Sequence, residues 1–521
     1  MQGSGSEVLE IRIVDLNHSG EGVGRKDGRV VFVPYAAPGD VAVVRVTENK
    51  PSFARAELLS IAKESPDRVL PPCPVYLKCG GCQLQHISYE AQLAYKTRRV
   101  KQALERIGKL EHVSVRDCLP APKTFHYRNK AKFSYEALPP HEVGSGCVHV
   151  PQEGQEHRFP EADYHSDEPR GLRGLPGGGA FCRVDTGTEH QRWFIAGFYG
   201  RRTHDVVDLN ECIIQNLTNN RVFEALNELV AERGIPVYGC DPLGKGTLKH
   251  LLVRCAGRGD RALAVLVTSG GPLATVDDIA RALTARAPEL EGVIEDVGGE
   301  VFAAEKAARR VTRASAGLRV IAGQGFLLEH ILGLRFIVSA ESFLQVNPEG
   351  MEVLYREALE VADLTGDEIA VDAYSGIGTL SLLLARECRH VYGIEAVETA
   401  VEDAARNAAL NHISNCTFIQ DRVEEVLANA VSPGQPRGRK VPRDADVVVL
   451  DPPRAGCDKR ALDAVVSLRP GRIVYVSCHP ETLARDLARL EASGYSTVSV
   501  QPVDMFPQTS HTEVVVLVTR E

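Results

Sequence analysis

The chain has 521 residues, too many for a single hydrophobic core, which predicts about three domains. Apolar residues make up 44% of it and charged residues 25%, a balance typical of soluble globular proteins. No apolar run approaches the roughly 20 residues of a membrane-spanning helix, and residues 1–6 lack the basic and apolar regions of a signal peptide. We therefore expect a cytoplasmic protein, a monomer, whose thirteen cysteines do not form a disulfide framework.

The net charge of −9 is unevenly distributed along the chain. Residues 91–133 contain eleven Lys and Arg against three Asp and Glu, a local balance of +8. A polyanion binds to a local patch of positive charge rather than to the average of the whole surface. The acidic total therefore does not exclude RNA as a partner.

The first 64 residues contain short runs rich in β-branched side chains, divided by Gly, Asp and Asn turns. The runs are Val8–Val14, Gly28–Val33, Asp40–Glu48 and Ser52–Ile61. Short strands in such close succession predict a small OB-like β-barrel over residues 1–66. The proline-rich residues 66–74 predict a linker after the barrel.

The middle of the chain mixes helical and strand patterns. Apolar residues recur at helical spacing over Ser88–Ile107, with basic residues on the other face, and predict a helix. From residue 118 to about 338 the pattern is mixed α+β. It is interrupted by residues 139–179, which are rich in Gly, Pro, His and Glu and have no core-forming pattern, so we interpret them as a mobile insertion.

After about residue 340, strand and helix patterns alternate regularly. The predicted strands are Glu368–Asp372, His390–Glu395, Cys416–Gln420, Asp446–Leu450 and Arg472–Ser477, followed by the pair Thr497–Val503 and Glu513–Val518. Five β/α units closed by a β-hairpin predict an α/β fold, a doubly wound sheet of the class I (Rossmann-like) methyltransferase kind.

A glycine turn follows the first of these strands, within Asp372–Thr379. Gly376 and Gly378 let the backbone turn tightly against a ligand at the N-terminus of the next helix, although G-x-G alone is also common in plain turns. Glu395 closes the second strand, where a carboxylate suits the two ribose hydroxyls of a nucleoside. The third glycine of a dinucleotide fingerprint is missing and no phosphate-binding lysine is nearby. The pattern therefore favours S-adenosylmethionine over NAD or ATP.

The fourth and fifth strands end in chemically distinctive residues. Asp451-Pro-Pro-Arg454 follows the fourth, and Arg454 replaces the aromatic residue typical of amino-methylating enzymes. Cys478 ends the fifth, and a cysteine thiolate can attack carbon 6 of a pyrimidine so that carbon 5 accepts a methyl group. A base must then remove the proton from carbon 5, and Glu513, at the start of the last strand, is the candidate. The alternatives are a packed thiol for Cys478 and a surface carboxylate for Glu513.

Three cysteines are clustered near the predicted barrel, in Cys73-x5-Cys79-Gly-Gly-Cys82. They need a fourth ligand to complete a metal site, and Cys212 is the best distant candidate. Zinc prefers two C-x-x-C pairs, whereas three clustered thiolates and a remote one suit a [4Fe–4S] cluster. The spacing favours iron–sulfur, with zinc and no metal as the alternatives.

Together these motifs are similar to the family of RNA uracil-5-methyltransferases, in particular to its iron–sulfur 23S ribosomal RNA branch with an N-terminal TRAM domain. Besides the cysteines, the glycine turn and the Asp451 motif, the resemblance is carried by Gln83–His86, Tyr127–Lys130, Ser342–Asn347, Ser477–Pro480 and His511–Glu513. Two positions depart from the family: His479, where Asn is usual, and Ser375, where Cys is frequent.

The resemblance implies a role for each candidate residue. S-adenosylmethionine would be contacted by Gln345, Tyr374, Glu395 and Asp451; Cys478 would be the nucleophile and Glu513 the proton acceptor; Cys73, Cys79, Cys82 and Cys212 would hold the [4Fe–4S] cluster. The implied domains are a TRAM-like barrel over 1–66, a central iron–sulfur and RNA-binding domain over 67–90 and 119–338, and a methyltransferase domain over 91–118 and 339–521.

We therefore expect an enzyme that methylates carbon 5 of a specific uridine in RNA, with 23S ribosomal RNA as the favoured substrate and a covalent cysteine adduct at carbon 6. The alternatives are the same chemistry on transfer RNA and a non-catalytic RNA-binding iron–sulfur protein. The barrel and the segment Lys96–Lys132 would contact phosphates, and Phe125 or Tyr127 would stack on bases.

Overall fold

The computed structural model describes residues 7–138, 193–240, 246–257, 259–298, 317–431, 441 and 445–521. The predicted insertion at 139–179 lies outside these residues. The chain divides into two compact units, Met1–Arg68 with Ala137–Ile195, and Val69–Glu136 with Ala196–Glu521. Among the described residues, every helix is too short or too polar to cross a membrane.

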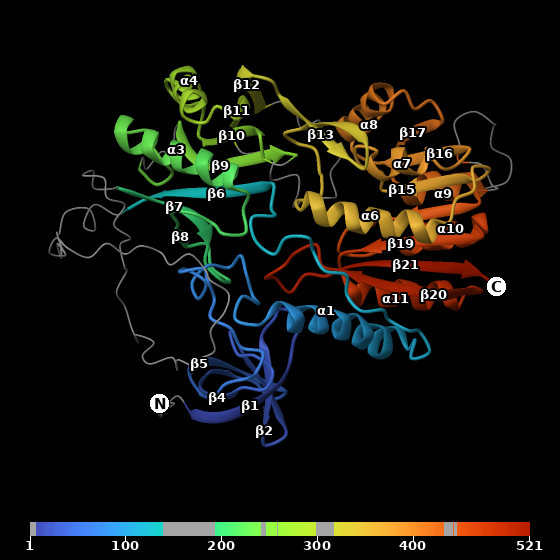
Figure 1. Ribbon diagram of the computed structural model, residues 1–521, viewed down its shortest axis with the longest axis horizontal. Coiled ribbons are helices and arrows are strands. Elements are labelled where there is room, and N and C mark those ends of the chain that lie inside the picture. Colours follow the sequence, from blue (N-terminus) through green and yellow to red (C-terminus); the bar gives the residue numbers. More distant parts are fainter. Residues whose placement is uncertain are drawn as a thin grey trace. The chain divides into compact units, whose positions relative to one another are not determined.

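The first unit contains a closed five-stranded barrel (Figure 1). In barrel order its strands are β1 (Val8–Leu16), β2 (Gly22–Lys26), β3 (Arg29–Val33), β5 (Phe53–Lys63) and β4 (Val41–Asn49). Alternate residues of β1, such as Ile11 and Ile13, point into the barrel, as the two-residue period of a strand requires. The predicted barrel is confirmed, but strand β2 was not predicted, because it contains a single β-branched residue.

The second unit contains a seven-stranded mixed sheet in its central part. In spatial order its strands are β12 (Leu318–Gly323), β11 (Leu290–Val297), β10 (Arg261–Ser269), β9 (Thr247–Ala256), β6 (Lys130–Ala137), β7 (Phe194–Tyr199) and β8 (Val206–Asp208). Helix α3 (Leu217–Arg233) packs on β9 and β10, and α4 (Val276–Arg286) packs on β11 and β12. This is the mixed α+β pattern that the sequence predicts between residues 118 and 338.

A second seven-stranded sheet forms the C-terminal part of the same unit. In spatial order its strands are β17 (Cys416–Gln420), β16 (His390–Glu395), β15 (Ile369–Ala373), β18 (Val447–Leu450), β19 (Arg472–Ser477), β21 (Glu513–Arg520) and β20 (Tyr495–Val503). The first five are parallel, and β21 is antiparallel to its neighbours. Helices cover both faces, so strands such as Val447–Leu450 are buried on both sides and consist of apolar residues. The predicted doubly wound fold is confirmed.

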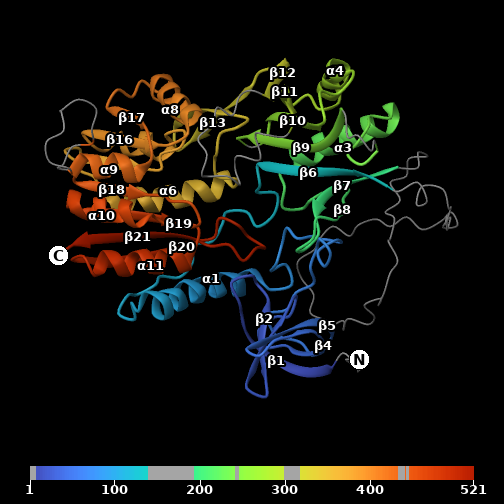
Figure 2. The ribbon, with the colours of Figure 1, turned by 180° about the vertical axis from the view of Figure 1, so that it is seen from behind.

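Two hydrophobic cores lie on opposite faces of this sheet. One contains residues of α6 (Pro348–Ala362), α7 (Thr379–Leu384), α8 (Glu398–Leu410) and the β13–β14 hairpin (Phe326–Ile331 and Leu334–Ser339). The other contains residues of α9 (Val423–Val431), α10 (Lys459–Leu468), α11 (Pro480–Glu491) and α1 (Tyr89–Ala103). Figures 1 and 2 show α1 lying alongside α11 and β20, although nearly 400 residues separate them in sequence.

Two expected RNA contacts, one on helix α1 and one in the segment after it, are wrong. Lys96 is fully buried, so it cannot contact a phosphate as expected. Tyr127 is 4% exposed and its hydroxyl donates a hydrogen bond to the carbonyl of Pro507, so it cannot stack on a base. Both side chains instead contact the loop before β21, Lys96 from α1 and Tyr127 from the segment after it.

Candidate active site

The parallel strands bring the predicted site residues to one edge of the C-terminal sheet. Tyr374 follows β15, Glu395 ends β16, Asp451 follows β18 and Cys478 follows β19. Glu513 begins β21, whose antiparallel direction places its first residues beside the end of β19, with Ser477 opposite Val514. The carboxyl ends of parallel strands are where doubly wound sheets bind ligands.

The glycine turn leaves open space beside the carboxylate of Glu395. One oxygen of Glu395 accepts a hydrogen bond from the backbone N–H of Gly376 at 3.0 Å, and the other accepts one from Val397 at 2.9 Å. Gly376 has a φ of +53°, and a Cβ atom there would meet no atom within 4 Å. Tyr374 also has a positive φ, +73°, which is uncommon for a bulky residue and typical of ligand sites. The open space and the oriented carboxylate fit the ribose of a nucleoside.

A second acid, Asp372, is part of the same edge and was not singled out from the sequence. It is buried at the end of β15 and accepts a hydrogen bond of 2.5 Å from the hydroxyl of Ser381. Burial raises the pKa of this carboxyl to about 7. Ser381 occupies the position of the third glycine in a dinucleotide fingerprint, so the departure from that pattern has a structural role here. The signal in the sequence that could have identified Asp372 was an acidic residue inside the otherwise apolar strand β15.

Cys478 and Glu513 both lie where ionisation is disfavoured. Burial raises the pKa of the Cys478 thiol to about 12, and the charges of Glu513 and Asp451 add to this. Glu513 is 3% exposed, and burial followed by the charge of Asp451 raises the pKa of its carboxyl to about 8. The exposed guanidinium of Arg454 lowers the pKa of both groups. These shifts place the two carboxyls and the guanidinium within electrostatic reach of the thiol.

His511 provides a neutral partner for Arg454. A guanidinium nitrogen of Arg454 lies 3.4 Å from both ring nitrogens of His511. Burial, followed by the charges of Arg454 and Arg99, lowers the pKa of the imidazole to about 3, so the ring is uncharged at neutral pH and one of its nitrogens can accept a hydrogen bond from the guanidinium. In the sequence, His511 was noted only as part of the motif His511–Glu513 and was assigned no role.

Gln345 lies in the segment between β14 and α6. It is 7% exposed, and the segment is held by Asn347, whose side chain caps α6 by accepting from Gly350 at 3.0 Å. The same amide donates to the carbonyl of Met505 at 3.0 Å. The contact of Gln345 with a cofactor stays a prediction.

All four predicted cluster cysteines line one cavity of 260 Å³. They are Cys73, Cys79, Cys82 and Cys212. Burial raises the pKa of every one of these thiols, that of Cys212 to about 12. Within the described ranges, however, no three His, Cys, Asp or Glu side chains are arranged to hold a metal ion. The donor set suits iron–sulfur chemistry, but the [4Fe–4S] cluster is not confirmed and stays a prediction.

Comparisons with known proteins agree with this geometry. The sequence model of the family described as tRNA (uracil-5-)-methyltransferase matches residues 313–521, and that of the TRAM domain matches residues 6–59. An uncharacterised RNA methyltransferase of Halalkalibacterium halodurans is 37% identical over 508 residues, covering 98% of this chain and 96% of that protein. One of Caldanaerobacter subterraneus is 37% identical over 516 residues, covering 99% and 98%.

A solved structure extends the similarity to three dimensions. It is that of the Pyrococcus abyssi tRNA (uracil-54, C5)-methyltransferase in complex with S-adenosyl-L-homocysteine. It is 26% identical, has a TM-score of 0.67, and the match covers 98% of this chain and 100% of that one. With relatives of this identity over almost the whole length, the chain belongs to the S-adenosylmethionine-dependent RNA uracil-5-methyltransferases and begins with a TRAM domain.

Proposed function

We propose that this enzyme methylates carbon 5 of one uridine in 23S ribosomal RNA through a covalent adduct between Cys478 and carbon 6. The observation that carries the chemistry is the convergence of Cys478, Glu513 and Asp451 at one sheet edge, where Glu513 and Asp451 lie close enough for their charges to raise the pKa of the Cys478 thiol. A binding protein has no need of a nucleophile and a base in such proximity.

Cys478 and Glu513 take part in three steps of the reaction, which are addition, proton removal and elimination. Bound S-adenosylmethionine supplies a methyl group on a positively charged sulfur. Cys478 adds as a thiolate to carbon 6, which places electron density on carbon 5, the position that is methylated. Glu513 then takes the proton from carbon 5, and the electron pair of that C–H bond restores the double bond between carbons 5 and 6. The carbon 6–sulfur bond breaks, and its electron pair leaves with the thiolate of Cys478.

The protonation states of the free site fit a proton acceptor that works near neutral pH. A carboxyl with a pKa raised to about 8 has its proton affinity matched to that pH, which is the condition for efficient general base catalysis. Cys478 is a thiol in the free site, because burial and, after it, the charges of two neighbouring acids disfavour a thiolate. Addition to carbon 6 therefore requires that the thiol first lose its proton.

RNA containing 5-fluorouridine tests the covalent step, because fluorine at carbon 5 cannot be removed as a proton. The wild-type enzyme should form an adduct that survives denaturing electrophoresis, and Cys478→Ala should form none. Glu513→Gln should accumulate an adduct even with ordinary uridine, since elimination waits for proton removal. Equal adduct formation by Cys478→Ala would falsify the assignment.

The substrate needs a separate test, because transfer RNA is a second candidate. The resemblance to the 23S ribosomal RNA branch supports ribosomal RNA, whereas the similar Pyrococcus abyssi enzyme is a tRNA (uracil-54, C5)-methyltransferase. Methylation mapping of both RNA classes from a deletion strain should show one unmethylated uridine in 23S ribosomal RNA. Loss confined to transfer RNA would transfer the proposal to that substrate.

We also propose that Cys73, Cys79, Cys82 and Cys212 hold a [4Fe–4S] cluster, supported by their sharing one cavity. Anaerobically purified enzyme should contain four iron and four sulfide per chain. Cys82→Ser should reduce both, while Cys240→Ser, at an exposed cysteine outside this cavity, should not. Wild-type protein that contains neither iron nor sulfide would refute the proposal.

A further inference from the structure

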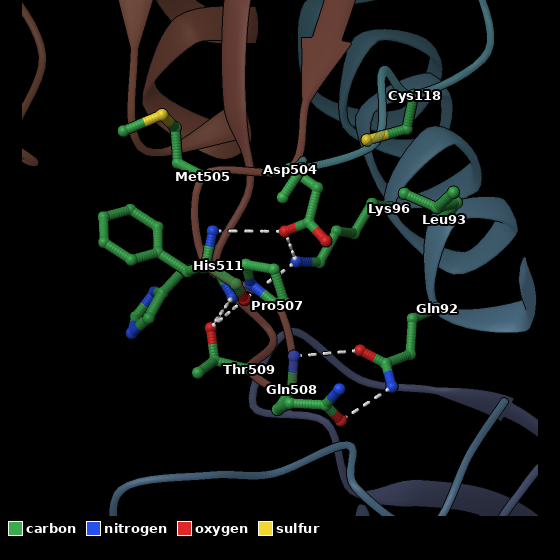
Figure 3. A network of polar contacts seen from close by, with 12 residues as sticks. Gln92, Leu93, Lys96, Cys118, Asp504, Met505, Pro507, Gln508, Thr509 and His511 are labelled. Atoms are coloured by element: carbon green, nitrogen blue, oxygen red, sulfur yellow. Dashed lines mark hydrogen bonds and ion pairs between the residues drawn. The ribbon is translucent and has the colours of Figure 1, made fainter. Parts of the chain in front are cut away.

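A buried ion pair joins α1 to the loop that leads into the predicted base. Lys96 and Asp504 are both completely buried, and the ammonium of Lys96 pairs with one carboxylate oxygen of Asp504. The same ammonium donates to the carbonyl of Phe506 at 3.1 Å, and that oxygen of Asp504 accepts from the N–H of Phe506 at 3.1 Å. Figure 3 shows Lys96 extending from α1 into the turn at the start of this loop.

The loop comprises residues 504–512, between β20 and β21, and has no regular secondary structure. Gln92 of α1 forms two hydrogen bonds with Gln508, of 3.0 and 3.1 Å (Figure 3). Arg99 of the same helix donates to the carbonyl of Ser510 at 2.6 Å. Loops without such anchors are mobile, so α1 holds residues 504–512 in place, together with the bonds from Tyr127 to Pro507 and from Asn347 to Met505.

The end of this loop is Glu513. Its backbone is paired with Val503, the residue just before the loop, so the loop closes directly on the proposed base. The charge of Lys96 also reaches the site, since it lowers the pKa of the Glu513 carboxyl and of the His511 imidazole. Lys96 thus acts on Glu513 both through the backbone and through space.

We propose that Lys96 is a positioning residue for proton removal: through its buried pair with Asp504 it holds the 504–512 loop so that Glu513 reaches carbon 5 of the uridine. This inference rests on the proposed role of Glu513 and deepens it. It assigns α1, more than 400 residues before Glu513 in sequence, to a single step of the reaction. Misplacement of a catalytic group by about 1 Å can cost about a hundredfold in rate.

The test variant is Lys96→Met with Asp504→Asn. Replacing Lys96 alone would leave a buried, unpaired carboxylate and can unfold the protein. The double variant removes both charges at similar volume, and the amide oxygen of Asn can still accept from the N–H of Phe506. The matched control is Lys101→Met, the same change on the same helix at an exposed lysine.

Proton removal is measured apart from addition. With 5-fluorouridine RNA the double variant should form the adduct within about twofold of the wild-type rate, since trapping needs no base. With ordinary RNA its kcat should fall about tenfold to a hundredfold at an unchanged KM. With uridine deuterated at carbon 5 its isotope effect on kcat should exceed that of the wild type, because proton removal becomes rate-limiting. Lys101→Met should match the wild type in all three.

Two results would overturn the inference. One is a double variant with the kcat and isotope effect of the wild type. The other is a parallel loss of trapping and turnover, which would indicate a general structural role for the pair. Wild-type enzyme that forms no adduct would instead refute the proposed function, so the two failures are distinguishable.

Discussion

Substitution of Gly376 by Ala would test whether the open space beside Glu395 holds the cofactor. At a φ of +53° an alanine costs about 1–2 kcal/mol of folding free energy relative to glycine. The added Cβ meets no atom within 4 Å, so no further cost arises from packing. If S-adenosylmethionine occupies that space, the methyl group displaces it from the Glu395 carboxylate. A loss of about 1.4 kcal/mol there corresponds to a tenfold weaker binding constant.

Gly234→Ala is the matched control for this experiment. Gly234 ends α3 with a φ of +59°, and a Cβ there also meets no atom within 4 Å. Both variants should lose about 1–2 kcal/mol of unfolding free energy in urea titrations. Only Gly376→Ala should bind S-adenosylmethionine tenfold or more weakly by calorimetry. Unchanged affinity in Gly376→Ala, or an equal loss in Gly234→Ala, would refute the assignment of the space to the cofactor.

Three further outcomes follow from the charges at this edge. Glu513 has a folded pKa of about 8 against roughly 4.3 in an unfolded chain, so the wild type should lose stability as pH rises from 5 to 8. Glu513→Gln should lose less, because only the raised pKa values of Asp372 and Asp451 remain, and its gain in melting temperature over the wild type should be larger at pH 8 than at pH 5; an equal gain at both pH values would contradict the shift. Arg454→Gln should slow iodoacetamide alkylation of Cys478 at pH 8, because Arg454 favours the thiolate; an unchanged rate would disprove that influence. Ser381→Ala should cost about 1–3 kcal/mol of unfolding free energy by leaving the buried carboxyl of Asp372 without its hydroxyl partner, and a neutral result would show that water replaces the bond.

The strands of the C-terminal sheet were predictable because parallel strands covered on both faces become continuous apolar runs. His390–Glu395, Cys416–Gln420 and Arg472–Ser477 form strands with the predicted bounds. Their ends were also predictable as a site, since parallel strands direct their carboxyl ends to one edge. The pKa shifts of Cys478, Asp451 and Glu513 were not predictable, because they depend on burial and on distances that spacing along the chain does not contain.

Lys96 is the one lysine of the predicted RNA-binding segment that the structure shows to be buried, and the sequence explains why. The positive balance of residues 91–133 suggested a solvated basic face, but Lys96 lies three residues after Leu93 and four before Val100. Residues at these spacings share one face of a helix, so Lys96 lies on the apolar face. That signal was present in the sequence. Its partner Asp504 lies 408 residues away, and nothing in the local pattern indicates the pairing.

The acidic groups of the site together predict how cofactor affinity should depend on pH. Asp372 raises the pKa of Asp451, Asp451 raises that of Glu513, and both Glu513 and Asp451 raise that of Cys478. Buried groups coupled in this way do not all ionise together, and a nearby positive charge lowers every pKa among them. By linkage, S-adenosylmethionine, which is a sulfonium cation, should bind more tightly as pH rises from 6 to 8 and should release protons. Calorimetry in buffers of different ionisation enthalpy measures both quantities. S-adenosylhomocysteine has the same nucleoside without the sulfonium charge, so its affinity should change far less; an equal pH dependence for the two ligands would refute the electrostatic coupling.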